Sequence, residues 1–246
     1  MKNVPPSLSE ESQAIHPKAE KRQHQNCLPR QAVTPKRLRL PLLVVGMAFS
    51  AFGISLIAAT ALGSTPISTI PLTLTAITGI SFGTTTFIVN ALFVVIQALL
   101  LRRNFRIRNL LQLPSVLVFS VFIDFSVRLL SGFEPASWTS AMSFSVLGTL
   151  LLAVGIILQI RSQTVVQPGE GLVLSVSLTF KKPFGDMKVL TDVMHVVTAA
   201  LIGWAVLGRI VQIREGTLVS AVLVGLFVKL GDKLVDRVIE KRRAAR

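Results

Sequence analysis

Residues 40–101 read LPLLVVGMAFSAFGISLIAATALGSTPISTIPLTLTAITGISFGTTTFIVNALFVVIQALLL and contain no Asp, Glu, Lys or Arg. Arg102 and Arg103 follow this run directly. A transmembrane helix needs about 20 apolar residues, because each residue adds about 1.5 Å and the hydrocarbon core is about 30 Å thick. The run is long enough for at least two crossings with a remainder, and it predicts an all-α, polytopic transmembrane bundle.

The composition of the whole chain agrees with a membrane protein. Of its 246 residues, 51% are hydrophobic and 15% are charged, whereas soluble domains carry about 25% charged residues. The net charge is +14, and the basic residues lie mainly in the tails and in connectors beside apolar runs, as the positive-inside rule requires. We therefore expect the lipid bilayer, and no nucleic acid, as the partner of these charges.

Motifs that would carry chemistry are few. The single cysteine, Cys27, excludes an intrachain disulfide and a multi-cysteine metal site. The sequence contains no Gly-rich phosphate loop, no HExxH motif, and no Ser or Cys nucleophile beside a plausible base. We expect no enzyme activity, no metal and no cofactor.

The two ends of the chain differ in composition from the rest. Residues 1–38 are rich in Pro, Ser, Gln and Lys and cannot offset the entropy of ordering, so we predict a disordered, basic cytoplasmic tail. A binding motif within this tail is the alternative. The apolar run after it is expected to act as an uncleaved signal anchor. Residues 239–246 form a second basic tail, also expected in the cytoplasm.

Between the tails we predict two membrane regions, residues 39–132 and 143–238. Runs long enough for full crossings lie near 40–60, 84–101, 110–131, 143–160, 187–208 and 216–235. Two shorter stretches rich in Ser and Thr remain, near 66–80 and 169–180.

The two regions look like repeats of one another. A shift of 102 residues takes Pro66 to Pro168, and it also relates these pairs: Gly46 and Gly148, Gly53 and Gly155, Phe82 and Phe184, Gly83 and Gly185. Convergent use of small residues in membrane helices is the alternative explanation. We expect two internally repeated halves.

The short stretches decide the topology. If they cross fully, there are eight spans and parallel halves, and most basic connectors fall on the side opposite the basic tails. If they are re-entrant or interfacial, there are six spans, and only Arg209 and Arg214 remain outside. The charges favour six spans with both termini cytoplasmic. Three spans per half would invert the second half, a pattern of secondary transporters.

Each short stretch begins at a proline. Pro66 is followed by Ser68, and Pro168 is followed by Glu170 at the equivalent position. Proline suits the first turn of a helix, whose free N–H groups attract anions. Two such starts facing each other would form a ligand site. The alternative is two ordinary loop-to-helix starts.

Three polar residues lie within apolar runs. Asn90 and Asp192 are again 102 apart, and His195 follows Asp192 on the same helical face. A carboxylate and an imidazole within a span are candidates for proton coupling or ligand contact. Alternatively, Asp192 lies near the headgroups with Asp186 and Lys188.

Four charged residues are candidates for structural ion pairs. Asp124 and Arg128 are spaced for a local i,i+4 pair, and Lys229 and Asp232 for a local i,i+3 pair. Pairing of Lys229 with Asp124 across the halves is the alternative.

The motifs resemble those of the bacterial YczE/YitT-type integral membrane proteins. The resemblance covers most of residues 40–238 and is carried by two sets of small-residue motifs. The first set is Gly46, Gly53, Leu62-Gly63-Ser64-Thr65-Pro66, Gly79, Phe82-Gly83-Thr84, Asn90 and Leu100-Leu101-Arg102-Arg103, and the second is Gly148, Gly155, Pro168-Gly169-Glu170-Gly171, Gly185 and Glu215-Gly216-Thr217-Leu218. The family typically has an aspartate two residues after each proline, whereas this chain has Ser68 and Glu170. The resemblance implies a bacterial inner (plasma) membrane protein without an assigned activity.

These observations favour a small-solute transporter or a solute-binding membrane subunit, with proton coupling through Glu170, Asp192 and His195. The solute-binding subunit would serve a separate energy-supplying complex. The alternative is a non-transporting scaffold or regulatory partner that acts through its basic tails, with a protein partner or homo-oligomer left open.

Overall fold

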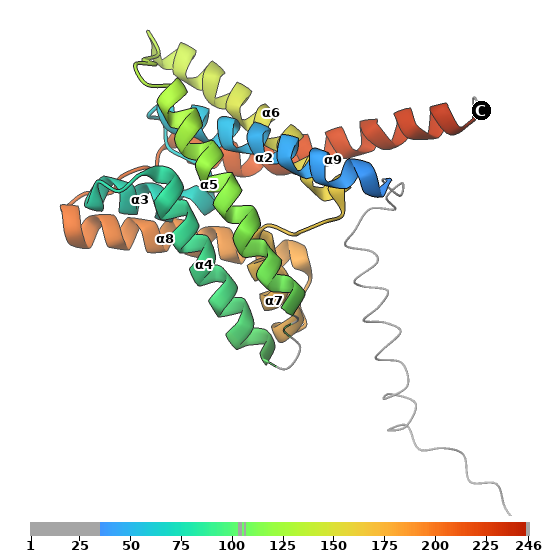
Figure 1. Cartoon of the computed structure of the whole chain (residues 1–246). Coiled ribbons are helices and arrows are strands. Elements are labelled where there is room, and N and C mark those ends of the chain that lie inside the picture. The colour runs from blue at the N-terminus through green and yellow to red at the C-terminus, as the bar shows by residue number, and fades with distance from the viewer. Residues whose placement is uncertain (1–34, 103–104, 106, 245–246) are drawn as a thin grey trace, which may run out of the picture. The chain divides into compact units, whose positions relative to one another are not determined.

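A computed structural model describes residues 35–102, 105 and 107–244, all within the compact unit of residues 34–246. Of the tail predicted for residues 1–38, residues 1–34 lie outside the described residues. The described chain is built from helices and short connectors (Figure 1). In chain order these are α2 (Lys36–Ala59), η1 (Pro66–Ser68), α3 (Thr69–Thr78), α4 (Phe82–Leu101), η3 (Ile107–Leu111), α5 (Gln112–Leu129), α6 (Trp138–Ser162), α7 (Pro168–Phe180), α8 (Phe184–Leu207) and α9 (Glu215–Ala244).

The prediction of an all-α membrane bundle is confirmed. Among the described residues, five helical stretches are long and apolar enough to cross a membrane: α2, α4, Asn109–Leu129, α6 and α8. The sixth predicted crossing, 216–235, lies inside α9, which also contains Lys229, Asp232 and Lys233. The structure thus has five helices of this kind rather than six, because these charges interrupt the apolar stretch of α9.

The helix ends differ in detail from the predicted boundaries. α2 begins at Lys36, so the last residues assigned to the N-terminal tail are helical. α9 continues to Ala244, so most of the predicted 239–246 tail is part of this helix. The polar and basic ends of both helices extend the apolar stretches that the sequence located.

The short stretches form short helices. α7 has 13 residues, and η1 with α3 covers Pro66–Thr78. At about 1.5 Å per residue, such a helix is about 20 Å long, which is less than the roughly 30 Å of a hydrocarbon core. Proline in the first turn fixes φ where no backbone N–H is needed, which explains both starts.

Helix starts recur at the shift seen in the sequence. α2 and α6 begin at Lys36 and Trp138, α4 and α8 begin at Phe82 and Phe184, and the short helices begin at Pro66 and Pro168. Each of these pairs of starts is 102 residues apart.

α2 and α6 cross closely at four glycines and run in opposite directions (Figure 1). A Cβ atom at Gly53 would stand 2.6 Å from the carbonyl oxygen of Gly148, and one at Gly46 would stand 2.8 Å from that of Gly155. Small residues allow backbones in membrane helices to approach this closely. Eight full crossings would make α2 and α6 parallel, so their antiparallel packing supports short helices that do not cross.

Apolar side chains fill the interior on both sides of this crossing. One cluster joins α2 to α5 and α6 through residues that include Ile57, Ile123 and Leu152. A second cluster joins α4 and α7 around Val89, Phe93 and Leu172. The second cluster surrounds the start of α7, where several candidate residues lie.

Candidate functional site

The start of α7 is held by glutamine side chains from α4 and α5. Gln97 Nε2 donates a hydrogen bond to the carbonyl oxygen of Pro168 at 3.1 Å and another to Gln112 Oε1 at 3.3 Å. A Cβ atom at Gly171 would lie 2.7 Å from Gln97 Oε1, so a larger residue at this position would displace the Gln97 amide. Gln97 is 1% exposed, and its amide fixes α7 against α4.

Gln167, the residue before Pro168, forms a second glutamine pair with Gln159 of α6. Gln159 Nε2 of α6 donates to Ser50 Oγ at 2.7 Å and to the carbonyl oxygen of Gly46 at 3.2 Å. Gln167 Nε2 donates to Gln159 Oε1 at 2.5 Å. The start of α7 is therefore tied to the α2–α6 crossing as well as to α4.

Sequence reasoning missed all four of these glutamines. Their only signal is an uncharged amide in or beside an apolar run, and such an amide needs a partner when it is buried. The partners come from other helices, so the pairing could not be read from spacing within one run.

The two short helices meet at their starts. The side chain of Ile67, the residue after Pro66, lies against Gly169, the residue after Pro168. The two prolines are thus close, as the ligand-site hypothesis requires. However, an apolar side chain lies between the helix starts, where the hypothesis placed an anion.

Hydrogen bonds inside the first short segment engage its hydroxyls. Thr65 Oγ1 donates to Ser68 Oγ at 2.8 Å, and Thr69 Oγ1 donates to the carbonyl oxygen of Pro66 at 2.6 Å. Ser68 is therefore a local structural residue in this segment, and it is 5% exposed.

Charged residues gather on α7 and α8. Lys188 Nζ and Asp192 Oδ1 form an ion pair at 2.5 Å, with side chains 35% and 22% exposed. The charges of Lys188 and Asp192 act on Glu170, in the first turn of α7, and also on His195. Glu170, Lys188 and Asp192 together carry one net negative charge when ionised, because the lysine balances one carboxylate.

His195 lies one turn beyond Asp192 and deeper in the protein. It is 5% exposed, and its ring packs on Phe93 of α4 with centroids 5.0 Å apart and planes tilted by 54°. Its Nδ1 atom has no hydrogen-bond partner among the described residues. A buried polar atom without a partner is uncommon and calls for a ligand, a water molecule or a proton.

Phe93 and His195 occupy equivalent positions, 102 residues apart, as do Ile67 and Gly169. In a chain built from two repeated halves, a contact between equivalent residues would lie on the axis that relates the halves. The buried hydroxyls of Thr73 in α3 and Thr86 in α4 also lack hydrogen-bond partners within the described chain.

Asn90 forms its hydrogen bond within its own helix rather than with Asp192. Its Nδ2 donates to the carbonyl oxygen of Thr86 at 2.8 Å, within α4. Of the candidates, Asp192 and His195 lie one turn apart on α8, Glu170 lies in the first turn of α7, and Asn90 is bonded to its own helix.

The structural ion pairs differ from those expected. Asp124 accepts hydrogen bonds from Gly83 N at 2.7 Å and Ser81 Oγ at 2.8 Å, so it binds the start of α4 rather than Arg128 or Lys229. Free N–H groups and the helix dipole at a helix start favour a carboxylate there. Arg128 and Lys229 are exposed.

Asp232 pairs with Arg161 rather than with Lys229. Arg161 Nη2 lies 2.6 Å from Asp232 Oδ1, and Arg161 Nε donates to the same oxygen at 3.0 Å. The two side chains are 9% and 17% exposed. A fork-shaped guanidinium on the adjacent α6 satisfies this carboxylate better than a lysine on the same helix.

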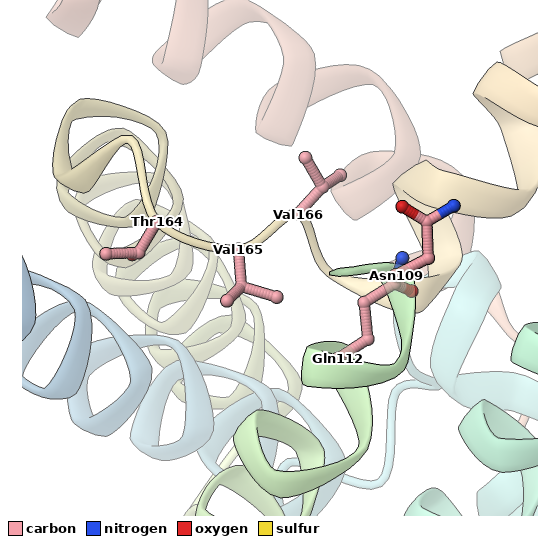
Figure 2. Close-up of a pocket in the computed structure, with 5 residues that line it drawn as sticks. All are labelled: Asn109, Gln112, Thr164, Val165 and Val166. Carbon is pink, nitrogen blue, oxygen red and sulfur yellow. The ribbon is translucent and has the colours of Figure 1, made fainter. Parts of the chain in front are cut away.

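A pocket of about 220 Å³ lies beside Gln112, between the connectors that precede α5 and α7. Figure 2 shows Asn109 and Gln112 on one side and Thr164, Val165 and Val166 on the other. Its lining carries no charge and includes none of the residues chosen from the sequence. Within the described residues, no three His, Cys, Asp or Glu side chains lie together as a metal site would require.

Comparison with known proteins identifies the family. The model of a family of unknown function, DUF6198, matches residues 37–233. The match covers most of the chain, so the protein belongs to this family. No curated protein and no solved structure matches the chain.

Proposed function

We propose that this DUF6198 protein is a secondary transporter that carries a small solute across a membrane, with proton coupling through Glu170, Asp192 and His195. In this proposal six helices cross the membrane, α2, α4, α5, α6, α8 and α9. The ion pair between Arg161 and Asp232 makes the sixth crossing feasible, because it neutralises a charge within α9.

The observation that carries the proposal is the pair of half-length helices that meet at their starts. α7 packs against α4 of the first half, and α3 packs against α8 of the second half. Short helices in matching positions of two inverted halves are typical of transporters, which bind their substrate where these helices meet the long ones. The antiparallel crossing of α2 and α6 supports inversion of the halves.

The polar groups of α7 and α8 support the location of the site. Charged groups within membrane helices are costly and are usually retained for substrate or proton pathways. Glu170, Asp192 and His195 form such a series, ending at the ring pair on the proposed axis. The net negative charge of Glu170, Lys188 and Asp192, when all three are ionised, would attract a proton or another small cation.

A flux measurement tests this proposal. Purified protein in liposomes would be incubated with a soluble metabolite extract, with and without a pH gradient, and the washed contents would be analysed by mass spectrometry. We expect at least one solute to accumulate with wild-type protein and not with Glu170→Gln. Glu134→Gln is the matched control, because Glu134 is exposed in the connector before α6.

Equal accumulation in wild type, Glu170→Gln and empty liposomes would contradict transport through this site. It would favour the alternative of a non-transporting scaffold, for which deletion of residues 2–35 should abolish function in cells. We also propose that the protein lies in the bacterial inner membrane with both termini in the cytoplasm and has no catalytic activity. Specific kinship with YczE/YitT-type proteins is part of the same proposal.

A further inference from the structure

The two halves differ at one pair of long helices. The contact between α2 and α5 in the first half corresponds to the contact between α6 and α9 in the second. The contact between α3 and α8 likewise corresponds to the contact between α7 and α4. α5 also packs against α4. The equivalent helices α9 and α8 make no comparable contact within the described residues, and α9 runs beside α6 away from α8 (Figure 1).

Specific contacts hold the α4–α5 pair together. The Asp124 carboxylate binds Gly83 N and Ser81 Oγ at the start of α4. A Cβ atom at Gly83 would collide with the carbonyl oxygen of Ser120, so the two backbones lie very close. The first half is therefore closed at this point.

The equivalent point of the second half has no such contact. Gly185 and Leu226 occupy the positions 102 residues after Gly83 and Asp124. A Cβ atom at Gly185 would meet nothing within 4 Å outside its own helix backbone, and Leu226 is 45% exposed. α8 is also the least buried of the five apolar helices, because only 22% of its 18-residue apolar stretch is buried.

We infer that the α4–α5 and α8–α9 contacts alternate, so that α9 closes on α8 in a second state while α5 separates from α4. This inference rests on the proposed transport function and on the inverted halves. The first half shows what the closed contact looks like, and the second half shows the separated one. Exchanging the two arrangements produces the second state without changing the α2–α6 crossing.

The inference assigns each contact to one face of the membrane. In the six-span arrangement α4 begins on one face and α8 begins on the other. The structure is then closed at the first face, by Asp124, and separated at the second. A solute beside Phe93 and His195 would exchange with one side at a time, as alternating access requires.

Disulfide trapping tests the second state. On a Cys27→Ser background, Gly185→Cys and Leu226→Cys would be oxidised in native membranes, and the cross-linked peptide would be measured by mass spectrometry. A state populated at only roughly 0.1–10% is trapped progressively by a covalent bond. We expect cross-linking about tenfold faster than for the control pair Gly185→Cys and Leu218→Cys, because Leu218 lies about 12 Å from Leu226, toward the start of α9.

A second arm tests the coupling between the two contacts. Asp124→Ala removes the bonds that hold α4 to α5, and it should speed the Gly185–Leu226 cross-link about tenfold, as expected when a bond favouring the present state is lost. Ser81→Ala removes one bond and should give a smaller increase in the same direction, which keeps the test valid if Asp124→Ala fails to fold. Glu134→Gln should change nothing.

Two results would overturn the inference. One is cross-linking no faster than in the control pair. The other is a cross-linking rate that neither Asp124→Ala nor Ser81→Ala changes. Solute flux without the cross-link would refute alternation at these helices while leaving transport standing. A coupled cross-link without flux for any solute would support the alternation and count against transport.

Discussion

Four glycines determine how closely α2 and α6 approach. At Gly53 an added methyl group would meet backbone atoms of Gly148 and Leu152 at 2.6 Å, and backbone cannot move aside as a flexible side chain can. The tolerance of this crossing for larger residues is therefore very low.

We predict that Gly53→Ala lowers the free energy of unfolding by about 1–3 kcal/mol, the usual cost of overpacking. Gly225→Ala is the control, because its Cβ atom would meet nothing within 4 Å. Melting temperatures of the detergent-solubilised variants, followed by fluorescence-detected size exclusion, give the comparison. Equal melting temperatures for the two variants would show that the helices do not cross at these glycines.

The ion pair between Arg161 and Asp232 is a second feature of single residues. We predict that Asp232→Asn destabilises the protein by about 3 kcal/mol, because it removes the carboxylate from a nearly buried guanidinium. Arg161→Met combined with Asp232→Leu should recover most of this loss. Chemical unfolding of the three proteins, with Glu134→Gln as the control for loss of an exposed carboxylate, measures both effects. A double variant less stable than Asp232→Asn would contradict this account.

At the scale of helices, α7 depends on amide contacts from its neighbours. Gln97 bonds both Gln112 and the carbonyl of Pro168, so the three helices α4, α5 and α7 share one junction. We predict that Gln97→Leu and Gln112→Leu each cost about 1–2 kcal/mol. The double variant should cost less than their sum by at least about 0.5 kcal/mol, because both changes remove the same bond.

Unfolding in a denaturant series would supply this double-mutant cycle. Strictly additive losses would mean that the two glutamines act independently. The bond between Gln97 and Gln112 would then add nothing to the junction at the start of α7.

The sequence located these helices well and their contacts poorly. Apolar runs and the prolines at residues 66 and 168 predicted most helices, and three pairs of helix starts recur at the shift of 102 found in the sequence. The partners of Asp124 and Asp232 were predicted wrongly, because local spacing cannot reveal a helix start or a guanidinium brought close by folding. The buried nitrogen of His195 and its contact with Phe93 likewise depend on tertiary packing.

At the scale of the whole molecule, the direction of α6 against α2 separates the two topologies. In the proposed six-span arrangement Arg102 and Val166 would lie on one face and Ala136 on the other, whereas eight crossings would reverse the face of each relative to the N-terminus. We predict that single cysteines at Arg102 and Val166, on a Cys27→Ser background, resist an impermeant reagent in intact cells. A cysteine at Ala136 should react.

Permeabilised cells provide the control, since all three positions should then react. Reaction of the first two cysteines from outside, with protection at Ala136, would require eight crossings. The inverted halves and the transport proposal would then lose their main support.

The crossing of α2 with α6 also imposes an order on biosynthesis. The two helices start about 100 residues apart, so at roughly 5–20 residues per second the ribosome releases α6 on the order of 5–20 s after α2. During this interval the face of α2 that carries Gly46 and Gly53 has no helix to pack against. The nascent first half then lies in the bilayer without α6. Chains truncated before residue 138 should therefore be substrates for the proteases that clear unassembled membrane helices.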